Sequence, residues 1–224
     1  MRLHLHESVR ERIPGVTFGM VTISGVTVRE HDTELWSQLE MVCKQQALTY
    51  SLDNLSDYEQ IAAVRRLQKS FGFDPTRYRP SSEALLRRVL KGQSLYQINT
   101  AVDGNNWCSV EFVLPMCVYD LHNVRGQAEV RVGKPDETYP GIGRQTFQVA
   151  NKIIIADDNG IMGSTVSDSE RTKVTTETRN ILLVIYAPPE IENAVIEQYA
   201  TRAGERIVTF NGGQTSDVAA LTVV

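Results

Sequence analysis

Apolar positions along the chain change from helical spacing in the first half to strand-like runs in the second half. Between positions 31 and 92, apolar residues recur mainly three and four positions apart, which is typical of helices with one buried face. Uninterrupted apolar runs follow at Ile153 to Ala156 and Ile181 to Ala187, and they have the length of buried strands. Helices come early and strands come late, so the sequence predicts an α+β fold and not a regular α/β alternation.

Boundary signals divide the first half into three predicted helices. The first begins near position 32, directly before a run of helically spaced leucines. The second is expected to begin at Ser56, where Glu59 would complete a capping box, and to end at Gly72. The third is expected to begin at Pro80 and to end before Gly92.

Turn signals and β-branched runs define the remaining predicted elements. The segment 16–28 is rich in Val and Thr and predicts one or two short strands. Asp157 to Gly160 predicts a hairpin turn, because Asn-Gly tolerates the positive φ angles of tight turns. Pro188 and Pro189 should end the last long apolar strand. A closing helix through Val195 and a final strand from Arg206 to Phe210 complete the prediction.

Composition indicates an ordinary globular protein. The chain has 224 residues, 42% of them hydrophobic, and lacks a low-complexity linker, so residues 1–224 are expected to form a single compact unit. The three cysteines match no zinc pattern, and neither a signal peptide nor a membrane span is apparent. We therefore expect a cytoplasmic protein without a membrane partner, with reduced thiols and no metal or cofactor. His4 and His6 have no third ligand nearby and are interpreted as surface residues.

Positive charge is concentrated in one stretch, although the whole chain carries a formal charge of −4. Positions 65 to 91 contain eight cations and only two anions. One interpretation is the solvated faces of two helices. The other is a surface that contacts nucleic-acid phosphates through Arg65, Arg66, Arg87 and Arg88.

Two passages resemble a known family. Arg77 to Gly126 contains V-D-G-N-N followed by P-M-C-V-Y-D-L, and Ala156 to Glu190 contains G-I-M-G followed by S-E-R-T-K-V-T and a buried strand. In order and separation they resemble the editing domain of the phenylalanyl-tRNA synthetase β subunit. The resemblance implies two intertwined domains that form a β-sandwich-like core flanked by helices. It also implies a pocket that hydrolyses tyrosine wrongly attached to tRNA. No aminoacylation motif is apparent, so ligase activity is not expected.

The resemblance assigns pocket positions residue by residue. The pocket asparagine of the family matches Asn106, its histidine falls at Cys117, and its paired glycines match Gly160 and Gly163. The glutamate that reads the tyrosine hydroxyl falls at Val184, so selectivity for tyrosine is not expected. Structural roles stay open beside these assignments: Asn106 as a local hydrogen-bonding residue and Cys117 as a buried apolar filler.

The polar segment from Asp168 to Thr172 also has two interpretations, a loop with a turn or a part of the pocket wall. Three hypotheses about function follow. The first is a hydrolase that acts in trans on mischarged aminoacyl-tRNA. The second is a non-catalytic module that binds tRNA or a small amino acid-like ligand. The third is a different small-molecule enzyme that uses Cys117 as nucleophile, with His122 as a candidate base.

Overall fold

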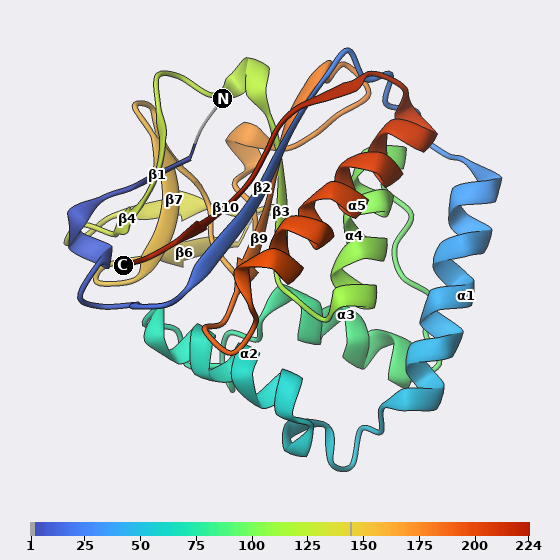
Figure 1. Cartoon of the computed structure of the whole chain (residues 1–224), viewed down its shortest axis with the longest axis horizontal. Coiled ribbons are helices and arrows are strands. Elements are labelled where there is room, and N and C mark those ends of the chain that lie inside the picture. Colours follow the sequence, from blue (N-terminus) through green and yellow to red (C-terminus); the bar gives the residue numbers. More distant parts are fainter. Residues whose placement is uncertain (1–2, 144) are drawn as a thin grey trace.

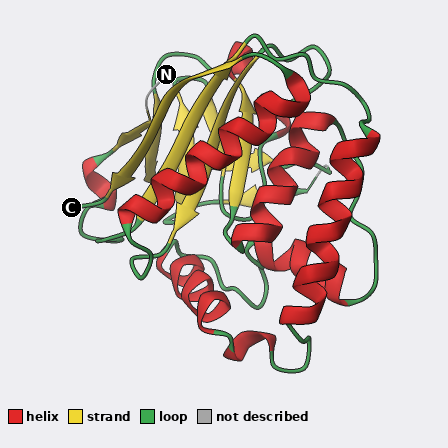
Figure 2. Cartoon of the chain, turned by 45° about the vertical axis from the view of Figure 1, so that its right-hand side comes forward, coloured by secondary structure: helices red, strands yellow, loops and turns green. Residues whose placement is uncertain are grey.

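Two four-stranded sheets and a group of helices form three layers. The computed structural model describes residues 3–143 and 145–224, and it confirms the α+β class. The first sheet has the order β1-β4-β7-β8 and the second the order β10-β2-β9-β3. Figures 1 and 2 show the helices gathered on one side of the strands, with α5 running diagonally across the second sheet.

The elements have the following bounds. The first sheet consists of β1 (Leu3–Leu5), β4 (Ala128–Val132), β7 (Ile153–Asp157) and β8 (Gly160–Gly163). The second consists of β10 (Gln214–Thr222), β2 (Thr17–Ser24), β9 (Asn180–Ala187) and β3 (Met116–Asp120), and β5 (Thr138–Pro140) pairs with β6 (Thr146–Gln148). The helices are α1 (Thr33–Thr49), α2 (Glu59–Ser70), α3 (Ser81–Leu90), α4 (Thr100–Phe112) and α5 (Asn193–Asn211). Four 3-10 turns are η1 (Glu7–Val9), η2 (Leu55–Asp57), η3 (Leu121–Asn123) and η4 (Glu170–Thr172).

Strand β9, in the second sheet, is buried on both faces. Along β9, Leu182, Val184 and Tyr186 belong to the core between the two sheets. The alternate residues Ile181, Leu183, Ile185 and Ala187 belong to the core under α4 and α5. Successive side chains of a strand point to opposite faces, so a strand between two apolar layers must be apolar at every position. This explains the unbroken run that the sequence shows here.

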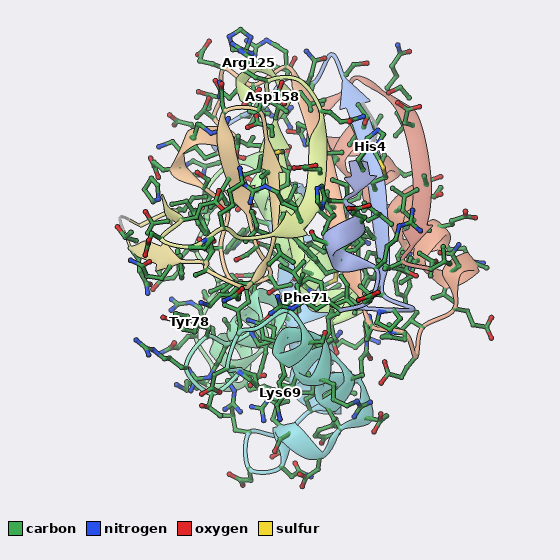
Figure 3. The ribbon with its side chains drawn as sticks, turned by 90° about the vertical axis from the view of Figure 1, so that its left-hand side faces the viewer. His4, Lys69, Phe71, Tyr78, Arg125 and Asp158 are labelled. Carbon is green, nitrogen blue, oxygen red and sulfur yellow. The ribbon has the colours of Figure 1, made fainter. Side chains whose placement is uncertain are left out.

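Aromatic side chains join α2 to the core between the sheets. Phe71, directly after α2, lies 6.2 Å from Phe18 and 6.0 Å from Tyr186 between ring centroids. Figure 3 shows Phe71 at the boundary between α2 and the strands. Among the described residues, no helix combines the length and the apolar character that crossing a membrane requires.

Most predicted boundaries agree with the structure. Asp32 caps α1, since its Oδ1 accepts the backbone N–H of Leu35 at 2.9 Å. The segment 16–28 contains one strand, β2, and β9 ends directly before Pro188. The hairpin turn joins β7 to β8, with Gly160 at a φ of 122°.

Two predicted elements were wrong. Arg206 to Phe210 is the last part of α5 and not a strand, because Ile196, Ala200, Ala203 and Ile207 continue one buried helical face. The last strand is β10, which follows two glycines with positive φ. The capping box at Ser56 does not form either. Ser56 lies in η2, and α2 begins only at Glu59, without a side-chain cap.

A buried carboxylate ties α2 to α3. Glu83 is only 1% exposed and accepts hydrogen bonds from Arg65 at 2.7 and 2.8 Å and from Arg87 at 2.6 Å. Burial alone would raise the pKa of Glu83, but the two guanidinium groups hold it below its ordinary value. The side chain is therefore charged at neutral pH and satisfied by both arginines.

We predict that Glu83→Gln will lower the free energy of unfolding by about 3 kcal/mol at pH 7, because two partly buried cations lose their counter-charge. Glu59→Gln is the matched control. Glu59 is 77% exposed, although it also pairs with an arginine, so its loss should have no measurable effect. Urea unfolding of both variants measures the difference. Equal losses of stability would contradict a special role for the buried carboxylate.

Candidate functional site

A polar cavity of about 540 Å³ lies between α4, β3 and the loops that follow β8 and η4. This volume is in the range that holds a small molecule or an amino acid. Polar side chains in the lining include Asn99, Asn105, Asn106, Cys117, Ser164 and Asp168, and the loop after η4 adds Lys173, Thr175 and Thr176. Residues that lie more than 60 positions apart in the sequence therefore meet in one site, which we call the polar pocket.

The start of α4 fixes one wall of the polar pocket. Asn99 caps the helix, since its Oδ1 accepts the backbone N–H of Val102 at 2.9 Å. Its amide nitrogen donates to the carbonyl of Val174 at 3.2 Å and thereby holds the neighbouring loop. Asn106 and Asn105 both line the pocket. The buried Asn105 Oδ1 has no hydrogen-bond partner among the described residues, so it is available as an acceptor.

Cys117 lies in β3, and its thiol lines the pocket in a buried environment. The Sγ atom donates to the carbonyl of Ser164 at 3.4 Å and to the Tyr186 hydroxyl at 3.5 Å. Burial raises the pKa of Cys117 well above its ordinary value. A thiol that stays protonated is a poor nucleophile. His122 is exposed and makes no hydrogen bond to the thiol within the described residues, so it does not serve as a base for Cys117.

The carboxyl group of Asp168 is part of the pocket wall. Its Oδ2 accepts the backbone N–H of Val118 at 3.3 Å, whereas its buried Oδ1 makes no hydrogen bond of normal geometry to a described residue. Burial raises the pKa of this carboxyl to about 7. Gly163 permits this arrangement: a β-carbon there would lie 2.8 Å from the Tyr119 hydroxyl and 3.0 Å from Asp168 Oδ1.

The other positions assigned from the resemblance do not line the pocket. Gly163 lies in contact with Asp168. Val184 is fully buried in β9, where it pairs with Cys117 of β3. Gly160 sits in the turn between β7 and β8, where its positive φ, and not access for a ligand, requires glycine. These three residues are not among those that form the cavity surface.

The segment after Asp168 serves the fold. Ser169 caps η4, and Arg171 forms an ion pair with Asp157 at 2.7 Å. Thr172 donates to the carbonyl of Met162 at 3.2 Å. Of the predicted polar segment, Asp168 and Glu170 line the pocket. An acidic residue three positions after G-I-M-G-S-T was the available sequence signal.

The four arginines of the proposed phosphate-contacting surface are engaged within the protein. Arg65 and Arg87 share Glu83, and Arg66 lies 2.6 Å from both Glu59 and Glu190. Arg88 stacks on the Tyr96 ring, with its guanidinium carbon 3.9 Å from the ring centroid. Much of the charge counted in the sequence is thus neutralised locally. The spacing of Glu83 and Arg87 was a sequence signal for this pairing.

Metal-binding clusters of three or more His, Cys, Asp or Glu side chains do not occur within residues 3–143 and 145–224. His6 has a local structural role instead, since it caps η1 and its Nδ1 lies 2.8 Å from the Ser8 hydroxyl.

Comparison with known proteins identifies the family. The model of the B3/4 domain matches residues 63–215, which is more than half of the chain, so this chain belongs to the B3/4 domain family. The uncharacterized protein YhzB of Bacillus subtilis (strain 168) is 21% identical over 194 residues, covering 87% of each protein.

Larger proteins match over part of their length. The phenylalanine–tRNA ligase β subunit of Psychrobacter arcticus is 31% identical over 100 residues, and that of Dechloromonas aromatica is 30% identical over 149 residues. The matches cover 44% and 60% of this chain but only 12% and 18% of the ligase subunits. A crystallised N-terminal fragment of the phenylalanyl-tRNA synthetase β subunit from Pyrococcus horikoshii aligns with 95% of this chain and 49% of that one, at 12% identity and a TM-score of 0.44.

The raised pKa of Asp168 predicts that the native protein loses stability as the pH rises. The folded state holds this proton more tightly than the unfolded state, whose carboxyl titrates near 3.8. The contribution of the protonated Asp168 to the free energy of unfolding is therefore complete below pH 4 and is lost as the pH approaches 7. Asp168→Asn removes this loss. Between pH 4 and pH 8, the free energy of unfolding of this variant should rise by up to ~4 kcal/mol relative to that of the wild type. Urea unfolding across this range tests it, with the exposed Asp158→Asn as control. Parallel wild-type and Asp168→Asn curves would contradict a raised pKa.

Thiol labelling provides an independent check of Cys117. Cys43 is partly exposed, whereas Cys108 and Cys117 are buried. Since alkylation requires an accessible thiolate, iodoacetamide at pH 8 should modify Cys43 first and leave Cys117 unmodified until the protein unfolds. Peptide mass spectrometry over a time course measures the order. Preferential modification of Cys117 in the folded protein would restore it as a candidate nucleophile.

Proposed function

We propose that this chain binds the aminoacyl end of a charged tRNA in the polar pocket and hydrolyses its ester in trans. The observation that carries the proposal is the position of Asp168, a carboxyl with a pKa near 7 in the wall of a cavity large enough for one aminoacyl group. A general base works best when its pKa lies close to the operating pH. Membership of the B3/4 domain family and the partial matches to tRNA ligase β subunits support the choice of substrate.

The proposed reaction uses a water molecule as the nucleophile. Asp168 accepts a proton from this water as its oxygen attacks the ester carbonyl carbon. The bond from that carbon to the ribose oxygen then breaks, and the protonated carboxyl returns the proton to the leaving oxygen. The unpaired Asn105 Oδ1 and the side chain of Asn106 are positioned to hold the substrate amino group, for which hydrogen-bond acceptors are required.

Two alternatives are weaker. A small-molecule enzyme with Cys117 as nucleophile is disfavoured by the buried, protonated thiol. A selective tyrosine-editing enzyme is disfavoured because the fully buried Val184 offers no group for a phenolic hydroxyl. Non-catalytic binding of tRNA or of an amino acid-like ligand remains the alternative outcome of the experiment below.

We predict that the purified protein hydrolyses at least one member of a set of tRNAs charged with each of the amino acids. Asp168→Asn should lower kcat by about 100-fold and remove a rise in rate that is centred near pH 7, because the general base is lost. Asn106→Ala should raise KM by about 10-fold with a smaller change in kcat, because it loses a binding contact.

Asp158→Asn is the control, since this exposed carboxylate is not among the residues that line the pocket and lies near Arg125 (Figure 3). Thermal melts exclude unfolding. If the wild type binds charged tRNA but hydrolyses none, the hydrolase is ruled out and the binding module takes its place. Equal loss of kcat in Asp158→Asn and Asp168→Asn would rule out Asp168 as the base.

A further inference from the structure

A cationic groove of about 460 Å³ opens beside the polar pocket. Its lining includes five cations, which are Arg77, Arg79, Arg87, Arg88 and Lys91. No aspartate or glutamate occurs among the described residues of this lining. A concave surface with charge of one sign attracts and holds ligands of the opposite sign.

The groove and the polar pocket share part of their walls. Ile142 and Ser167 line both cavities, and Ser167 directly precedes Asp168. Ser167 is held in place, since its carbonyl accepts the Tyr139 hydroxyl at 2.8 Å and its own hydroxyl donates to the carbonyl of Asp168 at 3.1 Å. A ligand that fills the pocket and extends past Ile142 would therefore enter the groove. The two cavities form the ends of one continuous surface.

Three groove cations are available to an external anion. Arg77, Arg79 and Lys91 are exposed and form no ion pair with any described residue. Arg65 and Arg66, in contrast, are each bound to carboxylates and lie outside the groove lining. The positive charge of the groove is thus less neutralised than that of Arg65 and Arg66 on α2.

Aromatic and amide side chains accompany these cations. The ring of Tyr78 is partly exposed, lies 6.3 Å from the Phe147 ring and has the Arg77 guanidinium 5.2 Å from its centroid. Gln93 and Gln145 add hydrogen-bonding groups to the same lining. Cations that follow a backbone, combined with an aromatic face on which a base can stack, are the features of grooves that bind single-stranded nucleic acid.

The geometry points to a groove that binds the phosphodiester backbone of a single-stranded RNA 3′ end and directs its terminal ribose towards the polar pocket. Arg77, Arg79 and Lys91 contact the phosphates, Tyr78 stacks on a base, and the shared wall at Ile142 and Ser167 marks the entrance to the pocket. This inference rests on the proposed function, because it names the part of the substrate that lies outside the pocket. It does not depend on hydrolysis.

The test uses a 5′-fluorescein RNA hexanucleotide that ends in CCA with a free 3′ hydroxyl, and fluorescence anisotropy measures its affinity. Exchanging Arg77, Arg79 and Lys91 together for glutamine should weaken binding at least 10-fold at low salt. It should also reduce the slope of log affinity against log salt by about 2, because each phosphate contact on a single strand contributes about 0.7. At pH 8, where the Asp168 carboxyl is ionised, the same RNA with a 3′ phosphate should bind at least 5-fold more weakly, because the added dianion would meet the charged Asp168.

A second triple variant with Arg10, Arg125 and Lys134 exchanged for glutamine has the same change of charge. These three residues are exposed and lie outside the groove lining, and Figure 3 shows Arg125 far from Tyr78. This variant should bind the RNA as wild type does. Absence of binding by wild type, or equal weakening in both triple variants, would overturn the groove assignment.

Equal affinity for the hydroxyl and phosphate ends would overturn the proposed direction of the strand. Failure of hydrolysis is a separate result. If the hexanucleotide binds through the groove while no charged tRNA is cleaved, the result supports the groove assignment and contradicts the proposed hydrolase activity. If charged tRNA is cleaved while the groove variant binds RNA as wild type does, the result supports the proposed hydrolase activity and contradicts the groove assignment.

Discussion

The burial of β9 on both faces is the constraint on which the rest of the structure depends. This strand pairs antiparallel with β2 along eight residues and with β3 along five. A shift of either pairing by one residue would exchange every side chain between the inter-sheet core and the core under the helices. Both cores are apolar, so neither accepts such an exchange without losing its packing. The register is therefore fixed from both sides.

The position of the polar pocket follows from that register. Pairing with Val184 places Cys117 on the inter-sheet face of β3, while Met116 and Val118 pack in the core under the helices. The turn from α4 into β3 is equally constrained. Val113 ends α4 in the left-handed conformation with a φ of 54°, and Ser109 donates to the carbonyl of Leu114 at 2.8 Å. The amides of α4 and the thiol of β3 thus line the same cavity because the core has already oriented both elements.

Sequence periodicity was sufficient for elements whose local signals agree with their environment. The helix after Asp32, the turn before Gly160 and the strand before Pro188 each combine a burial pattern with a cap or a breaker. The final part of α5 was not predicted, since Ile207, Val208 and Phe210 look like a strand locally and are helical only because the preceding buried face continues. Strand β10 was missed because it is half-exposed and lacks an apolar run.

The candidate site was less accessible to sequence reasoning than the fold. The resemblance located Asn106 and Cys117, which line the cavity, but gave no separate weight to Asp168, whose raised pKa arises only from burial by surrounding elements. The charge count on α2 and α3, in contrast, overstated the positive charge available to a ligand. It could not show that Arg65 and Arg87 share one buried carboxylate.

These two electrostatic environments have a common physical basis. Glu83 is buried with two guanidinium partners and stays charged, so it stabilises the packing of α2 against α3. Asp168 is buried without a cation and holds a proton up to about neutral pH. The first arrangement is satisfied within the protein and needs nothing from outside. The second leaves an acceptor unpaired beside a cavity, and unsatisfied buried polar groups of this kind are retained where a ligand or a reaction completes them.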